Sequence, residues 1–197
     1  MTGAHRALVT AVLVAASACS LGRRTPELHY YVLAVPGTPP SALDAPVRIG
    51  VFTADQPYAT TRLAYRTSPY RLDYYTYHRW AADPRQMIPA AIRDYLERAA
   101  SRDGGPPYVV EGHVRRLEEV DQSGGRVGAI GLEVRVQRAG RIVLASAYEE
   151  VEPAAEANPE AVAAALSRAL GRILDRIAAD LTAAGMRSGG RPWASTS

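Results

Sequence analysis

The chain has 197 residues, of which 47% are hydrophobic and 22% charged, the balance of a one-domain globular protein with short segments outside the core at its ends. A net charge of +3 argues against a nucleic-acid-binding face, which needs clustered cations; all 23 basic residues are arginines. The single cysteine, Cys19, excludes an internal disulfide and any CxxC metal or redox site.

Residues 1–18 predict a secretory signal peptide. Arg6 precedes an apolar run over residues 7–16, and small residues then lead to Cys19. Ten helical residues span about 15 Å, half of a hydrocarbon core of ~30 Å, so we expect no stable transmembrane helix here.

Residues 16–19 (ASAC) resemble a bacterial lipobox, in which the cysteine is acylated and becomes the first mature residue. The alternative is an A-x-A cleavage site that releases a soluble protein with a free thiol. We expect lipidation, because the single cysteine stands where lipidation would use it. Ser20 follows the cysteine, and by resemblance to Gram-negative lipoproteins this favours anchoring at the periplasmic face of the outer membrane.

Residues 19–27 predict a lipidated tether, followed by a folded domain over residues 28–185. A strand is expected over 29–35, and four prolines make 36–46 a loop. The alternation of apolar residues predicts a strand over 47–53, and residues 63–67 and 70–75 predict a hairpin around Ser68-Pro69.

Asp83 and Pro84 suit the start of a helix whose apolar face continues to Ala99, before Gly104-Gly105 stop it. Strands are expected over 107–120, 126–138 and 141–152, with a tight turn at Ala139-Gly140.

A final helix should begin at the cap Asn158 and end at Gly185, leaving residues 186–197 as a disordered tail. The order of elements predicts an α/β (α+β) fold, with a single antiparallel or mixed β-sheet and two main helices packed on it.

Three segments follow the cysteine-bearing leader: 30–33 (YYVL), 49–51 (IGV), and the run from 63–66 (LAYR) to 77–80 (YHRW) that leads into the Asp83 helix. In their order and spacing they resemble the ABC-type transport auxiliary lipoprotein family. The resemblance implies an accessory subunit of an envelope lipid transport system, bound to MCE-domain or ABC transporter subunits and held on the membrane by its lipid anchor. A homo-oligomer is also possible in principle, but no residue pattern points to one.

The segments that carry the resemblance also supply the candidate contacts with a partner or a lipid. Tyrosine presents an apolar body with a polar tip, which suits an interface, but alternate tyrosines can equally line a half-buried sheet. An arginine here could bind a lipid phosphate or form a surface ion pair, and the tryptophan could be a binding anchor or a core residue. The candidates are Tyr65, Arg66, Tyr77, His78, Arg79 and Trp80.

The sequence offers no catalytic residues, and we expect no enzyme, cofactor or metal. There is no HExxH, GxSxG or Walker motif, and without lysine neither a Walker lysine nor a Schiff base can form. Glu118 and Glu119 are adjacent in a strand, so their side chains should point to opposite faces rather than form a dyad. The rival functions are a structural or assembly lipoprotein that chaperones an outer-membrane component and, less favoured, a secreted enzyme.

Overall fold

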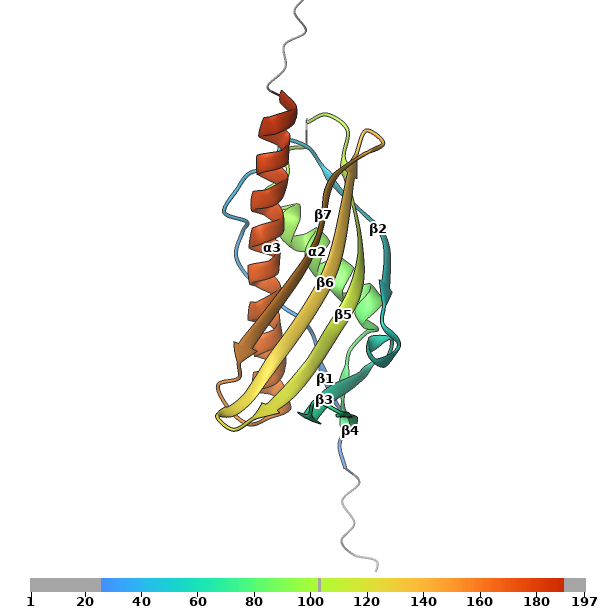
Figure 1. The fold of residues 1–197 in the computed structure, drawn as a ribbon, viewed down its shortest axis with the longest axis vertical. Coiled ribbons are helices and arrows are strands. Elements are labelled where there is room, and N and C mark those ends of the chain that lie inside the picture. The colour runs from blue at the N-terminus through green and yellow to red at the C-terminus, as the bar shows by residue number, and fades with distance from the viewer. Residues whose placement is uncertain (1–25, 103, 190–197) are drawn as a thin grey trace, which may run out of the picture.

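The computed structural model describes residues 26–102 and 104–189, which form one sheet with two long helices (Figure 1). The predicted signal peptide, Cys19 and residues 190–197 of the predicted tail lie outside the described residues. The elements, in chain order, are β1 (His29–Tyr31), β2 (Val47–Ala54), the 3-10 turn η1 (Gln56–Tyr58), β3 (Arg62–Ser68), β4 (Arg71–Trp80), α2 (Pro84–Leu96), β5 (Tyr108–Gln122), β6 (Gly125–Arg138), β7 (Arg141–Pro153) and α3 (Pro159–Gly189).

The sheet has seven strands and is mixed, as the sequence predicts. Its order is β1-β4-β3-β5-β6-β7, and β2 pairs with β5 outside this path. The β3–β4, β5–β6 and β6–β7 pairs are antiparallel, whereas β1–β4, β2–β5 and β3–β5 are parallel. Ala139 and Gly140 both have positive φ, which is the geometry of the tight turn expected between β6 and β7.

One side of β5 is shared by two strands placed end to end. β2 pairs with residues 108–114 of β5, and β3 pairs with residues 118–120. The turn η1 lies between β2 and β3 in the chain, so it falls where the sheet changes from one neighbour to the other. Tyr58, at the end of η1, is therefore placed beside the middle of β5.

Both helices cover the same face of the sheet, and the other face is open (Figure 1). The apolar stripe of α3 includes Leu166, Leu170 and Ile173, which are buried in one core with α2 and the inward residues of the strands. A Cβ on Gly128 of β6 would lie 2.8 Å from Leu166 Cγ, so the glycine allows α3 its close approach. The helix starts were correctly predicted: Asp83 accepts from Arg85 N at 2.9 Å, and Asn158 accepts from Ala161 N at 2.8 Å.

Three predicted boundaries were wrong. The first strand ends at Tyr31 instead of continuing to Val35, because the chain leaves the sheet edge and Ala34 N donates to Ser167 Oγ of α3 at 3.1 Å. Helix α2 ends at Leu96, since the carbonyl of Ala99 accepts from Leu43 N in the neighbouring loop. Helix α3 continues past Gly185 to Gly189. Gly185 lies inside the helix, where a glycine costs only about 1 kcal/mol, so it does not end α3.

Candidate functional site: the open face of the sheet

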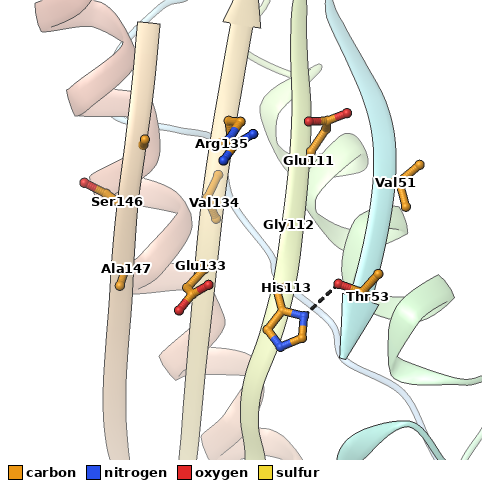
Figure 2. A pocket seen from close by; sticks show the side chains of 11 residues that line it. Val51, Thr53, Glu111, Gly112, His113, Glu133, Val134, Arg135, Ser146 and Ala147 are labelled. Atoms are coloured by element: carbon orange, nitrogen blue, oxygen red, sulfur yellow. Dashed lines mark hydrogen bonds between the residues drawn. The ribbon is translucent and has the colours of Figure 1, made fainter. Parts of the chain in front are cut away.

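The open face carries a shallow groove of about 530 Å³ across β2, β5, β6 and β7 (Figure 2). The strand alternation that buries Val134 and Val136 turns Glu133 and Arg135 outward. On β7, Ala145 and Ala147 are register partners of Arg135 and Glu133, and their small side chains leave the space that forms the groove.

Charged side chains of both signs line the groove. Glu111 and Arg135 are register partners on β5 and β6, and Arg115 Nη1 donates to Glu133 Oε1 at 2.9 Å. His113 is held between Asp55 Oδ1 at 2.8 Å and Thr53 Oγ1 at 2.7 Å (the latter bond is drawn in Figure 2). These groups are suited to recognising a polar surface that carries both positive and negative charge.

Val51 adds an apolar element to this polar groove. Its side chain is 69% exposed and lies on β2 at the side of the groove. An exposed valine beside charged groups gives a partner apolar area to bury within a polar rim, the usual composition of a protein–protein contact.

A buried carboxylate lies next to this face, between β3 and β6. Glu118 has a fully buried side chain, and it accepts from Tyr58 Oη at 2.8 Å, from Arg66 Nε at 2.9 Å and from Arg116 Nε at 2.8 Å. Burial alone would raise the pKa of Glu118, but the donors from Arg66, Tyr58 and Arg116 outweigh burial and lower it. The carboxylate therefore stays charged and holds η1, β3 and β5 together.

The candidates Tyr65 and Arg66 lie on opposite faces of β3. Arg66 is outward and is the partner of Glu118, so it contributes to the structure of the sheet. The Tyr65 ring lies on the helix side, 4.7 Å from the ring of Tyr75, whose hydroxyl donates to Glu119 Oε2 at 2.9 Å.

The other four candidates are consecutive on β4 and do not form one site. The ring of His78 faces His29 and Tyr31, and Tyr31 Oη lies 2.8 Å from His78 Nδ1. Trp80 is 2% exposed, which agrees with the interpretation of this residue as part of the core. Tyr77 is 42% exposed, and the Nε atom of Arg79 is buried without a hydrogen-bond partner among the described residues.

The opposed orientation of Glu118 and Glu119 is confirmed, but the sequence analysis missed that both are buried. Glu119 lies on the helix side, where Tyr75 and Arg126 contact it, and burial dominates and raises its pKa. One pattern in the sequence could have indicated this burial. Glu118 and Glu119 are adjacent in a strand whose other residues alternate between apolar and polar, and they lie close to Arg115 and Arg116.

Within residues 26–102 and 104–189, no helix is both long and apolar enough to cross a bilayer. The same residues contain no group of three or more His, Cys, Asp or Glu side chains that could hold a metal ion.

Two solved structures share this fold. A protein from Xanthomonas campestris superimposes with a TM-score of 0.69 at 21% identity, over 82% of this chain and 99% of that one. A second solved structure, of an uncharacterized protein, gives a TM-score of 0.64 at 12% identity, over 79% of this chain and 99% of that one. Identities this low establish a shared fold and nothing further.

The family model for the ABC-type transport auxiliary lipoprotein component matches residues 31–178. The chain belongs to this family, and the sequence-based resemblance is confirmed. None of the curated proteins matches the sequence.

Proposed function

We propose that the protein is a lipid-anchored, periplasm-facing accessory subunit of an ABC/MCE-type envelope lipid transport system and acts by binding partner subunits. The family supports an auxiliary role in ABC-type transport. The predicted signal peptide and the lipobox-like residues 16–19 support export and a lipid anchor, and Ser20 after the cysteine favours the outer membrane.

The observation that carries the binding role is the open face of the sheet. A sheet normally buries both faces or keeps one polar and solvated, and this one adds a groove with an exposed valine and an ordered set of charges. We therefore assign the groove on β2, β5, β6 and β7 as the contact surface for an MCE-domain or ABC transporter subunit.

Site-specific photo-crosslinking in intact membranes tests this assignment. A photoreactive residue at Val51, Arg135 or Ala147 should form an adduct with a transporter or MCE-domain subunit, identified by mass spectrometry. The control is Glu97, which is exposed after α2 on the helix side of the molecule. The proposal fails if the groove positions form no adduct with such a subunit. Adducts with an outer-membrane assembly component would instead support the assembly lipoprotein.

The anchor has its own test, which does not depend on the partner. The intact mass of protein extracted from membranes should equal the chain from Cys19 plus acyl groups, and the Cys19→Ala variant should be released from membranes. An unmodified soluble chain beginning at Cys19 would contradict the anchor.

A further inference from the structure

The edge of the sheet at β1 exposes a short apolar stripe. Leu28, Tyr30 and Val32 are 45%, 61% and 60% exposed, whereas His29 and Tyr31 face the ring of His78. Tyr30 alternates with His29 and Tyr31 in β1, so its side chain points to the side opposite His78, and the exposed Leu28 and Val32 flank the strand. Tyr77 of β4, which precedes His78, is 42% exposed and lies on the same side.

Two arginines lie beside this stripe without a counter-charge. Arg79 is the register partner of Tyr30 in β1 and of Arg62 in β3, which places two cations side by side. No ion pair joins either of them to a carboxylate of the described residues, although Arg66 in the same strand as Arg62 pairs with Glu118. Arg62 instead lies 4.2 Å above the ring of Tyr74.

The Nε atom of Arg79 makes this arrangement unusual. It is buried with no hydrogen-bond partner among residues 26–102 and 104–189. Buried donors in native proteins are nearly always satisfied, and guanidinium groups bind phosphate oxygens strongly. Two neighbouring arginines that form no ion pair with a carboxylate of the described residues match an anionic group that approaches from outside the protein.

The position of the stripe relative to the lipid anchor identifies the occupant. Residues 19–28, fully extended, span at most about 36 Å, so a lipid on Cys19 limits how far β1 can lie from the bilayer. β1, β3 and β4 gather at the end of the molecule opposite the C-terminal end of α3 (Figure 1). Exposed tyrosines and aliphatic side chains next to arginines have the chemistry of a surface that lies in the headgroup region.

We propose that this docking edge (Leu28, Tyr30, Val32 and Tyr77 with Arg62 and Arg79) lies on the phospholipid bilayer to which Cys19 is anchored. The arginines bind headgroup phosphates, and the apolar side chains enter the interface. The inference rests on the lipid anchor of the proposed function and adds an orientation: the domain stands on this edge, which leaves the groove on the open face accessible to a partner.

The test uses the full lipidated chain, reconstituted in vesicles of phosphatidylethanolamine and phosphatidylglycerol. Because Cys19 carries the anchor, a Val32→Cys substitution supplies the one free thiol for an environment-sensitive fluorophore. Quenching by nitroxide-labelled lipids then reports contact with the bilayer. The matched control is Ile142→Cys on β7, at the other edge of the sheet, where the native side chain is 59% exposed.

The label at position 32 should be quenched and the label at position 142 should not. Each of Arg62→Gln and Arg79→Gln should reduce the ratio of docked to undocked protein about fivefold, since a basic residue near an anionic membrane contributes roughly 1 kcal/mol. Arg141→Gln is the charge control, because Arg141 is exposed on β7, away from the docking edge. If Arg79→Gln does not fold, Arg62→Gln and Tyr30→Ser carry the test, because Tyr30 is exposed.

Equal quenching at positions 32 and 142, or quenching that both arginine substitutions leave unchanged, would overturn the proposal. Protection of the label at position 32 by a second copy in detergent, without vesicles, would show an interface between copies and also overturn it. A chain that does not stay with the vesicles would refute the anchor, and the docking edge with it. Crosslinking from the groove tests the partner separately, so each failure is identifiable.

Discussion

Replacing Glu118 by glutamine should lower the free energy of unfolding by about 2–3 kcal/mol. The side chain is fully buried and accepts from Tyr58, Arg66 and Arg116. Removing one partner of a buried ion pair costs about 3–5 kcal/mol. A loss at or just below the lower end of this range is expected here, because the side chains of Arg66 and Arg116 are 26% and 34% exposed and can recover hydration.

The pH dependence of this difference gives a second measurement. The pKa of Glu118 in the folded protein is below its ordinary value of 4.5, so the folded state favours the charged form. Its contribution to stability is therefore present above pH 4.5 and is lost as the pH falls through the folded-state pKa. The gap between wild type and Glu118→Gln should be constant between about pH 5 and 8 and should shrink below pH 4.5.

Urea unfolding followed by circular dichroism measures both effects. The control is Glu133→Gln on the same face: Glu133 is 51% exposed and its partner Arg115 is 54% exposed, so the loss should stay below about 1 kcal/mol. The reasoning is refuted if Glu118→Gln is as stable as wild type, or if acid leaves the gap unchanged.

Substitutions at three further positions test the packing and the helix start. Gly128→Ala should destabilise by about 1–3 kcal/mol, because its Cβ would meet Leu166 Cγ at 2.8 Å and Leu166 N at 3.0 Å; an unchanged urea midpoint would show that α3 can move away. Trp80→Ala should cost about 3–5 kcal/mol in the same assay, since the side chain is 2% exposed, and a loss under 1 kcal/mol would contradict its place in the core. Asp83→Ala should cost about 1 kcal/mol by removing the cap of α2, whereas Asp83→Asn should retain most of it; equal effects of the two would rule out capping as the cause.

Local sequence patterns were sufficient for much of the fold. The alternation of residues 130–136 predicted which side chains of β6 face the core, because a strand has a side-chain period of two. Asp83-Pro84 and Asn158-Pro159 marked the two helix starts, since capping is decided within one turn of the chain. The order of the elements and the spacing of three segments were enough to indicate the family.

The limits of local reasoning appear where the chain meets distant parts of itself. Gly185 was expected to end α3, but glycine in a helix costs only about 1 kcal/mol, and the packing of α3 against its neighbours β6 and β7 stabilises the helix. Likewise, the backbone bond between Leu43 and Ala99 ends the first helix at Leu96. Neither neighbour can be identified from the residues adjacent in sequence.

By itself the sequence determined the lone cysteine, the element types and the polar side of the central strands, because each depends on composition or on a short period; the export signal is a prediction from the same kind of pattern. Only the tertiary structure decided that β2 and β3 share β5, that Glu118 is buried among donors from three segments, and that Arg62 and Arg79 lie together without a carboxylate. The physical reason is that strand pairing and the burial of a charge depend on contacts between residues about 50–60 positions apart, as for Glu118 with Tyr58 and Arg66, which no local periodicity specifies.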